Sequence, residues 1–400
     1  MKILEEGITV PRGFEANGIS CGIKEDKELD LALIYSEVPA VTAGLFTSSN
    51  FPAHHIILDR KRLKKGYSQA VIINSGNANC AIGRKGLEDA ERITQSLAKE
   101  LGIDSNLVLM ASTGIIGKRL PLKRIERAIS SLVREKGRNK FILAAKAIMT
   151  TDKHPKYIAV EFKISGKKIR MGAMAKGAGM ISPHLATMLC FITTDLDIRL
   201  GLLRKALKEA VEVSFNRISV ERAMSTNDTI LIMANGLAGN KKIESPRSKE
   251  FFVFREGLEF VCQYLAREIV YDGEGATKFI TVRVKGAKDK FSAEKIARTI
   301  GRSPLFKTAM YGGNPNWGRI VACCGASGVN FKPEKLEIRF GEMLVFKNGN
   351  SQNNFSKRLK DYLKRREIEV EIDLNLGREE YLVWTTDFSE EYVKINASYE

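Results

Sequence analysis

The sequence predicts an α/β protein in which mixed sheets are packed against helices. Segments with helical periodicity and segments with strand-like alternation follow one another along the 400 residues without a strict order. A regular strand–helix alternation would instead favour a doubly wound parallel sheet. The apolar fraction of 44% and the charged fraction of 28% are ordinary for a globular protein. A chain of this length can bury two or three cores, or one large interlocked unit.

Helices are predicted where apolar residues recur every three or four positions. The clearest case is 87–101, where Ile93, Leu97 and Leu101 are four residues apart and Gly102 follows as a natural end. The same reasoning predicts further helices at 121–136, 140–150, 199–213, 255–268, 293–300 and 355–365.

Strands are predicted where apolar and polar residues alternate. Residues 158–164 alternate in this way, Ser165 and Gly166 make a turn, and a second run follows over 168–175, which together predict a hairpin. An apolar run at 188–195 reads as a buried strand. Further strands are expected at 229–234, 279–285, 336–340, 368–374 and 380–386.

Charge and cysteine content narrow the class of protein. The net charge is +17, but acidic residues stand among the basic ones and no nucleic-acid signature with interleaved aromatics occurs, so we expect a solvated lysine-rich surface and no nucleic-acid partner. No run of about 18 apolar residues predicts a membrane span, and the acidic start MKILEEGITV does not resemble an export signal. The six cysteines form no C-x-x-C pair, so we expect reduced thiols in a cytoplasmic protein and no metal site.

Most familiar catalytic motifs are missing from the sequence. GAMAKGAG at 172–179 does not match the dinucleotide fingerprint in its context, and no G-x-x-x-x-G-K-[ST] occurs, which disfavours nucleotide binding. The four histidines form no H-E-x-x-H, and there is no G-x-S-x-G elbow. A Ser-His-Asp hydrolase is therefore disfavoured, and a nucleophile in this chain needs another base.

The stretch KGAGMISPHLATMLCFITTD at 176–195 offers one. A threonine at a chain N-terminus carries its own base, because its α-amino group has a pKa of roughly 7.7–8.0. Thr187 is internal and gains this amine only if the Ala186–Thr187 bond is cut. Glycines 177 and 179 permit the backbone angles of a strained approach to that bond. From spacing alone, a plain glycine-rich loop before a buried strand is the more ordinary interpretation.

A resemblance to a known family favours the self-cleaving segment over the plain loop. KGAGMISPHLATML at 176–189 resembles the signature of the ornithine acetyltransferase family, also called the glutamate N-acetyltransferase family. The resemblance covers essentially the whole chain in order. The other blocks include TVPRGFEANGISCGIK at 9–24, NSGNAN at 74–79, ASTGIIG at 111–117, MTTDKHPK at 149–156, STNDT at 225–229, GEGATKFI at 273–280 and SPLFKTAMYGGNPNWGRI at 303–320.

The resemblance implies a fold, an assembly and a reaction. The implied fold is the ornithine acetyltransferase/DmpA-like α/β fold, self-cleaved into an α chain of residues 1–186 and a β chain of residues 187–400 that form one interlocked unit. Two copies of each chain would make an α2β2 heterotetramer. Thr187 would carry the acetyl group from N-acetylornithine to glutamate through an acetyl-enzyme, in arginine biosynthesis. No cofactor is implied, although some members accept acetyl-CoA as a donor.

The resemblance also implies roles for individual residues. Thr113 and Gly114 match the pair that stabilises the oxyanion, although on their own residues 112–114 read as a turn. Thr150 matches a substrate contact, although on its own it reads as a helix C-terminal residue. The expected catalytic residues are Thr187, Thr113 and Gly114, the cut lies between Ala186 and Thr187, and the expected substrate contacts are Thr150, Lys176, Thr187, Glu274 and Asn396.

Departures from the family pattern leave alternatives open. The family has D-G-D-x where this chain has residues 221–224 (ERAM), an aspartate where Asn314 stands, commonly an asparagine at His184, and a further threonine one position beyond Glu400. These differences bear on substrate preference. The alternatives are an N-terminal-nucleophile amidase or aminopeptidase of related fold, an inactive uncleaved paralogue, and a basic RNA-binding protein.

Overall fold

A computed structural model describes residues 1–25, 27–180, 188–221, 223, 225–352 and 357–398. These residues form two compact units. Among them, the first unit contains residues up to 177, 188–216 and 225–269. The second unit contains residues 178–180, 217–221, 223 and everything from 270 onward. Each unit is built on its own sheet. Because each unit consists of several separate segments, the chain passes from one unit to the other more than once.

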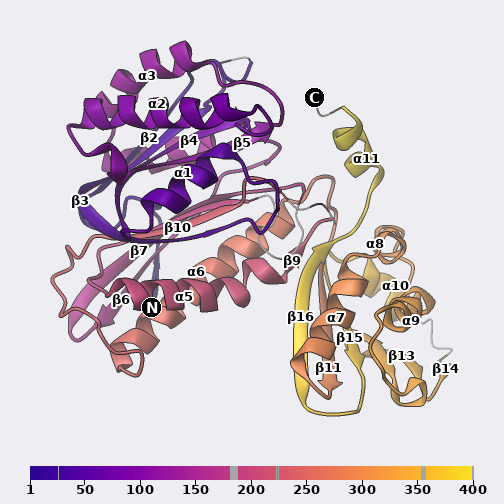
Figure 1. The fold of residues 1–400 in the computed structure, drawn as a ribbon. Coiled ribbons are helices and arrows are strands. Elements are labelled where there is room, and N and C mark those ends of the chain that lie inside the picture. Colours follow the sequence, from indigo (N-terminus) through magenta and orange to yellow (C-terminus); the bar gives the residue numbers. More distant parts are fainter. Residues whose placement is uncertain (26, 181–187, 222, 224, 353–356, 399–400) are drawn as a thin grey trace. The chain divides into compact units, whose positions relative to one another are not determined.

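The first unit is built on a nine-stranded mixed sheet (Figure 1). Its strands β8 and β10 run parallel, as do β4 and β5, and the other neighbours are antiparallel. The order is β1 (Lys2–Leu4), β6 (Lys156–Ile164), β7 (Lys167–Lys176), β8 (Leu189–Thr194), β10 (Thr229–Ala234), β3 (Leu31–Phe46), β4 (Tyr67–Asn77) and β5 (Val108–Ile115), with β2 (Phe14–Ile19) also on β3. The predicted mixed sheet is confirmed, and so is the hairpin, since Ile164 pairs with Lys167.

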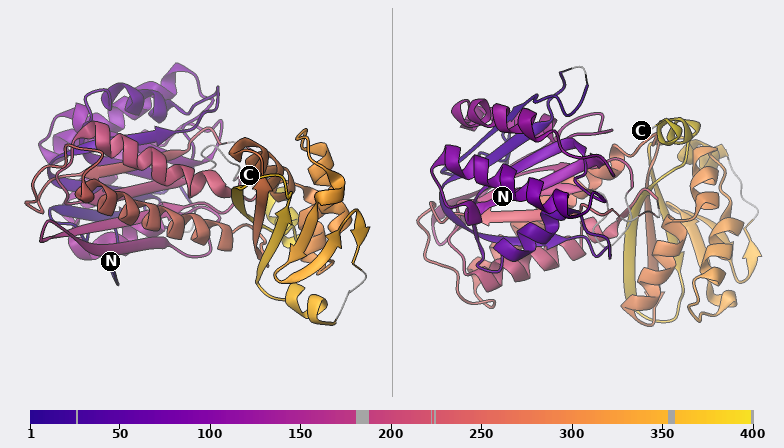
Figure 2. Two further views of the ribbon diagram at one scale, coloured as in Figure 1. Left: turned by 90° about the horizontal axis from the view of Figure 1, so that it is seen from below. Right: turned by 45° about the horizontal axis from the view of Figure 1, so that its top comes forward.

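Six helices accompany this sheet among the described residues: α1 (His54–Arg62), α2 (Arg84–Leu101), α3 (Leu122–Arg134), α4 (Phe141–Ala147), α5 (Leu200–Glu212) and most of α6 (Lys249–Tyr271). The prediction for 87–101 is confirmed, because α2 ends at Gly102 in the left-handed conformation with φ 68°. The helix predicted at 140–150 is shorter and ends at Ala147. Figures 1 and 2 show α2 and α3 on one side of the sheet and α5 and α6 on the other.

The core of the first unit lies on both faces of β3, β4 and β5. Leu33, Ile72 and Met110 face one way and pack against α2 and α3, while Ile73 and Ala111 face the other way. This second face shares a cluster with residues of α4, β7, β8 and β10. Because both faces of these strands are buried, apolar and polar residues do not alternate along them.

The second unit packs helices on one face of a seven-stranded mixed sheet. Its strands are β14 (Asn350–Ser351), β13 (Met343–Lys347), β12 (Glu337–Phe340), β15 (Glu367–Asp373), β11 (Phe279–Ala287), β16 (Glu379–Thr386) and β9 (Ile218–Ser219), in that order. The helices are α7 (Lys290–Gly301), α8 (Pro304–Tyr311), α9 (Trp317–Ala326), α10 (Lys357–Leu363) and α11 (Glu390–Ala397). Ile280, Val282 and Val284 of β11 face the helix side, whereas Arg283 between them pairs with Glu369 at 3.0 Å.

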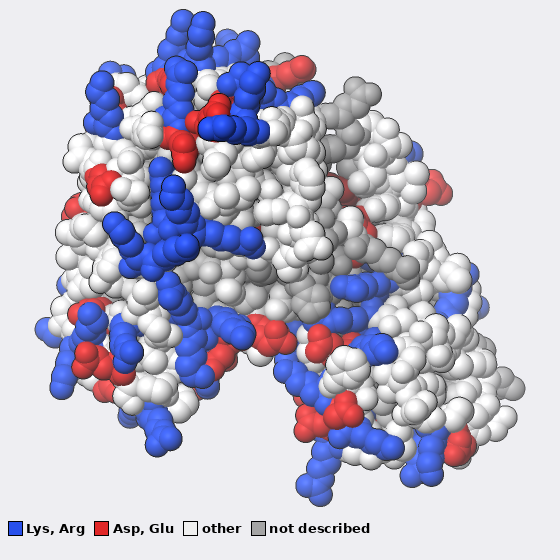
Figure 3. All heavy atoms as spheres, in the orientation of Figure 1, with Lys and Arg blue, Asp and Glu red and all other residues white. Residues whose placement is uncertain are grey.

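Three expectations from the composition concern the cysteines, membrane-spanning helices and the charge of the surface. All six cysteines carry free thiols, and no described helix is long and apolar enough to cross a bilayer. On the face that Figure 3 shows, Lys and Arg side chains stand beside Asp and Glu on both units, which is the mixed surface expected from the sequence.

Candidate functional site

The predicted oxyanion pair lies near the C-terminal end of β5, an edge strand of the first unit's sheet. Thr113 and Gly114 belong to β5, so the interpretation of residues 112–114 as a turn is wrong. Asn227, from the predicted block at 225–229, fixes this strand end by donating from Nδ2 to the carbonyl of Ser112 at 2.7 Å. Thr113 is buried. Its hydroxyl is therefore held by a strand, which positions a side chain more rigidly than a loop does.

Gly114 is a glycine because two backbones meet there. Its φ is +131°, a value that other residues rarely adopt. A Cβ at this position would lie 2.3 Å from the carbonyl carbon of Gly76 and 2.4 Å from the amide nitrogen of Asn77. Strand β4 bulges at this point, where the register between β4 and β5 shifts. The family glycine at this position thus has a structural reason that is independent of any catalytic role.

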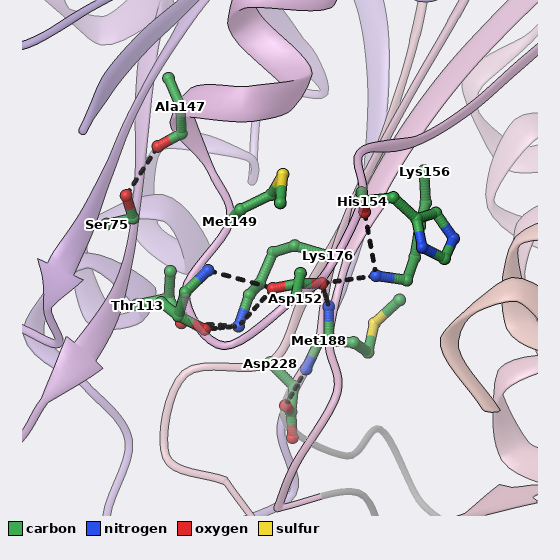
Figure 4. A network of polar contacts seen from close by, with 12 residues as sticks. Ser75, Thr113, Ala147, Met149, Asp152, His154, Lys156, Lys176, Met188 and Asp228 are labelled. Carbon is green, nitrogen blue, oxygen red and sulfur yellow. Dashed lines mark hydrogen bonds and ion pairs between the residues drawn. The ribbon is translucent and has the colours of Figure 1, made fainter. Parts of the chain in front are cut away.

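Lys176 connects two of the predicted site residues (Figure 4). It is the last residue of β7 and is 3% exposed. Its Nζ donates to the Thr150 hydroxyl at 2.6 Å and lies 3.5 Å from the Thr113 hydroxyl. Thr150 follows the end of α4, so β5, β7 and the segment after α4 each supply one side chain. The structure therefore brings Thr113, Thr150 and Lys176 together as the resemblance implies.

Asp152 holds this cluster, and sequence reasoning missed it. Its carboxylate accepts hydrogen bonds from the amides of Gly177 at 2.7 Å and Thr150 at 3.0 Å. It also accepts from Lys156 Nζ at 2.7 Å and lies 3.8 Å from Lys176 Nζ. The Asp152 and Lys156 side chains are both 0% exposed. One buried carboxylate thus fixes both the backbone next to Lys176 and the charge of Lys176 itself.

The electrostatic balance at Asp152 favours the ionised form. Burial alone would raise its pKa, but the neighbouring Lys176 and Lys156 ammonium groups and the Gly177 amide hold the pKa well below its usual range. A third lysine lies close by: Lys24 Nζ donates to the Met149 carbonyl at 2.7 Å, just before Thr150. Burial lowers the pKa of Lys24. Lys24 Nζ also lies 3.7 Å from the Glu28 carboxylate. The site thus places the buried ammonium groups of Lys156 and Lys176 beside the Asp152 carboxylate, and ammonium groups suit an anionic substrate group.

The predicted nucleophile Thr187 and its neighbour Ala186 lie outside the described residues. The chain is described again from Met188, whose amide donates to the Asp228 carboxyl at 3.1 Å. Asp228 is buried, and burial raises its pKa well above the usual value. Within the described part of the chain, its other oxygen, Oδ2, has no hydrogen-bond partner. The start of β8 is therefore tied to Asp228, which belongs to the predicted block at 225–229.

The two remaining site residues contact each other in the second unit. Asn396 on α11 donates from Nδ2 to the Glu274 carboxylate at 2.9 Å, although 122 positions separate them. The Glu274 amide donates to the Ala178 carbonyl at 2.9 Å. A Cβ on Gly179 would lie 2.3 Å from the Glu274 carboxylate, so a larger residue there would require this carboxylate to move. Gly179 of the signature therefore lets the Glu274 carboxylate lie close to the backbone.

The departure at Glu221 has a defined structural role. Its carboxylate accepts from the Tyr392 hydroxyl on α11 and from the amide of Met180, all within the second unit. Burial and the contact with Glu221 raise the pKa of Tyr392 above its ordinary value. Glu221 therefore ties the backbone at Met180 to α11, the helix that carries Asn396.

Among the described residues, no group of three or more His, Cys, Asp or Glu side chains could hold a metal ion. The donors of the first-unit site are lysine, threonine and backbone amide groups. Such a set recognises carboxylates and oxyanions and does not bind a cation.

Comparison with known proteins gives consistent results. A model of the ArgJ family matches residues 15–400. An "arginine biosynthesis bifunctional protein ArgJ" of Caldanaerobacter subterraneus subsp. tengcongensis is 46% identical over 407 residues, covering 100% of both chains. A "glutamate N-acetyltransferase" of Methanocaldococcus jannaschii is 43% identical over 413 residues, also covering 100% of both. The crystal structure of an ArgJ protein from Bacillus halodurans is similar with a TM-score of 0.50 and 38% identity, covering 52% of this chain and 98% of that one.

Proposed function

The chain belongs to the ArgJ family, and from this we propose that it is a glutamate N-acetyltransferase of arginine biosynthesis. It moves the acetyl group of N-acetylornithine to glutamate and so produces ornithine and N-acetylglutamate. The observation that carries the proposal is full-length identity of 43–46% to relatives with these names. The signature at 176–189 is also present in full, including the Ala186–Thr187 bond.

The reaction proceeds through an acetyl-enzyme on Thr187. The Thr187 hydroxyl attacks the acetyl carbonyl carbon of N-acetylornithine and gives its proton to its own α-amine. The carbon–nitrogen bond then breaks, and the ornithine nitrogen leaves with a proton. Glutamate, through its neutral amine, takes the acetyl group in a second attack that restores the threonine. The cycle is ping-pong and uses no cofactor, and acetyl-CoA is an alternative acetyl donor.

Contacts among the described residues support roles for the other residues of the proposed site. The Thr113 hydroxyl and the Gly114 amide stabilise the oxyanion, and one such donor contributes about 3 kcal/mol. Lys176, held by Asp152 and bonded to Thr150, recognises the substrate carboxylate. In the second unit, the Glu274 carboxylate holds a substrate ammonium group and Asn396 supports it.

The nucleophile is made by cutting the chain between Ala186 and Thr187, which gives an α chain of 1–186 and a β chain of 187–400. The solved Bacillus halodurans chain is matched over 98% of its length by only 52% of this chain, so it is about half as long, as a separate product would be. The assembly is an α2β2 heterotetramer in the cytoplasm.

The first experiment is intact mass under denaturing conditions, beside a Thr187→Ala variant. We expect two fragments, ending at Ala186 and starting at Thr187, that are absent from the variant. A single uncut chain after long incubation would refute the self-made nucleophile and favour an inactive paralogue.

The second experiment measures ornithine release from N-acetylornithine with and without glutamate. Transfer predicts that glutamate accelerates release and that N-acetylglutamate forms in equal amount. Equal release without glutamate, with free acetate as product, would identify an amidase instead.

A further inference from the structure

A basic hollow in the second unit has no role in the proposed reaction. It has a volume of about 360 Å³ and is lined by Lys295, Arg298, Thr299 and Arg302. These positions are three and four residues apart, so they form one face at the C-terminal half of α7. Three of the four lining side chains are cations. Cations at a helix C-terminus complement the helix dipole, but that explanation does not require Arg298 to be buried as it is.

Arg298 is buried and incompletely bonded. Its Nε donates to Glu294 at 2.7 Å, and its Nη2 donates to the Tyr381 hydroxyl at 2.9 Å. Among the described residues its Nη1 has no hydrogen-bond partner although it is buried, and the residue is 8% exposed. An unpaired buried donor destabilises the fold, so native proteins rarely keep one without a reason. Two fixed bonds hold the guanidinium in place, which presets the third nitrogen for a partner from outside the chain.

A second arginine lies against the same tyrosine. The Arg217 guanidinium carbon is 4.9 Å from the centre of the Tyr381 ring, and that of Arg298 is 5.4 Å from it. Among the described residues, Arg217 Nε is also buried without a hydrogen-bond partner. The carboxylate that pairs with Arg298 in this part of the chain is Glu294. Two buried arginine nitrogens, Arg298 Nη1 and Arg217 Nε, thus belong to guanidinium groups that lie against the same tyrosine ring.

The adjoining surface suggests what else the ligand carries. A neighbouring hollow of about 390 Å³ shares Thr299 and includes Leu305, Ala322 and Ala326 beside Asn316 and Arg319. A basic hollow next to a partly apolar one fits a molecule with an anionic end and a less polar body. Both volumes are at the low end of the range for small-molecule sites, about 300–1,000 Å³.

We propose that the hollow lined by Lys295, Arg298 and Arg302 binds a phosphate group, either free or at the end of a larger metabolite. A phosphate monoester carries about −1.5 to −2 charges at pH 7, and three of the four side chains that line the hollow are cationic. Arginine guanidinium groups bind phosphate oxygens in a bidentate manner. Thr299 supplies no donor, because its hydroxyl already donates to the Lys295 carbonyl at 2.7 Å.

The test is calorimetric titration of the full protein with inorganic phosphate, coenzyme A and dephospho-coenzyme A, which lacks the terminal phosphate monoester. Potassium chloride at matched ionic strength is the control for screening. The variant is Lys295→Ala, which leaves the Arg298 bonds to Glu294 and Tyr381 intact. The matched control is Lys290→Ala, an exposed lysine in the first turn of the same helix that does not line the hollow.

We expect phosphate binding to weaken about tenfold in Lys295→Ala and to stay unchanged in Lys290→Ala. A tenfold preference for coenzyme A over dephospho-coenzyme A, lost in Lys295→Ala, would assign the site to the terminal phosphate of a larger ligand. Binding of inorganic phosphate as tight as that of coenzyme A would assign it to the free anion. No binding beyond the chloride control, or equal binding by both variants, would overturn the proposal. Because the titration reads binding and not acetyl transfer, its result is separate from that of the cleavage experiment.

Discussion

The buried pair of Asp152 and Lys156 allows a quantitative test of how the first-unit site is held. The perturbation is Asp152→Asn, which keeps the shape and an accepting oxygen but removes the charge. Lys156, with a side chain 0% exposed, would then be left as a buried cation 2.7 Å from a neutral group. Removing one partner of such a pair typically costs about 3–5 kcal/mol. We therefore expect the free energy of unfolding to fall by that amount.

A double-mutant cycle separates the pair from its surroundings. Lys156→Met alone should also destabilise, because Asp152 loses its nearest ammonium group and keeps the more distant Lys176, 3.8 Å away. The double variant should lose less than the sum of the single changes, with a coupling energy of about 1–3 kcal/mol. Lys176 would still lose its carboxylate in the double variant, so acetyl transfer should stay low although stability partly recovers. Rescue of stability without rescue of transfer would mark Asp152 as a positioning residue for Lys176.

The assay is urea unfolding followed by circular dichroism in the Thr187→Ala background, where the chain stays whole. The control is the exposed pair Arg84–Glu88, with side chains 91% and 56% exposed, for which Glu88→Gln should have no measurable effect. Additive single changes would refute the reasoning, and so would an Asp152→Asn effect no larger than that of the control.

The same group predicts a dependence on pH. The pKa of Asp152 lies below its unfolded value of about 3.9, so the folded state binds fewer protons. The stabilisation is therefore complete above about pH 5 and is lost as the pH falls through 4 toward the folded pKa. Asp152→Asn should lose less stability than wild type over this range. Parallel curves for the two proteins would contradict the assignment.

Three further predictions concern single positions. Gly114→Ala should lower the melting temperature and transfer activity far more than Gly117→Ala, because both have positive φ but only at Gly114 would a Cβ meet backbone atoms within 2.4 Å; equal losses measured by thermal unfolding and the transfer assay would contradict the steric argument. Burial lowers the pKa of His55 to about 3, so wild type should lose up to about 1.4 kcal/mol of stability per pH unit below 6.5. His55→Leu should flatten that slope, and an unchanged slope would exclude His55 as its source. Burial lowers the pKa of Lys307 to about 7, so between pH 7 and 10 wild type should gain stability relative to Lys307→Met, and a constant difference in urea midpoints would show that Lys307 keeps its proton.

The parts of the fold that the sequence predicts well are those with a local pattern. The helix ending at Gly102 and the hairpin around Ser165 each bury one side, so their periodicity is visible in neighbouring residues. Strands β3, β4 and β5 were not predicted; both of their faces are buried, so alternation does not mark them. Burial on both faces does not by itself hide a strand, because β8 and β10 are also buried throughout and were predicted.

The candidate site likewise combines residues that the sequence predicts and residues that it does not. The family blocks point to Lys176 and Thr150, and the structure brings them together at 2.6 Å. Asp152 stands two residues beyond Thr150 in the same block, yet it was not singled out, because its contacts with residues 176 and 177 form only after β6 and β7 have paired. Likewise the contact between Glu274 and Asn396 spans 122 positions. Long-range partners of this kind leave no periodic trace in the sequence.

If the chain is cut as proposed, the pairing of β7 with β8 has a consequence for how long the folded protein lasts. Residues 171–176 lie before the Ala186–Thr187 bond and pair in register with residues 189–194 after it, inside one sheet. Folding of the whole chain is a first-order process, whereas the cut protein can regain its sheet only when two separate polypeptides meet. Its recovery from denaturant therefore becomes second-order and slows on dilution. The cut would thus act as a one-way step, after which the lifetime of the enzyme depends on its unfolding rate and no longer on an equilibrium with its unfolded chain.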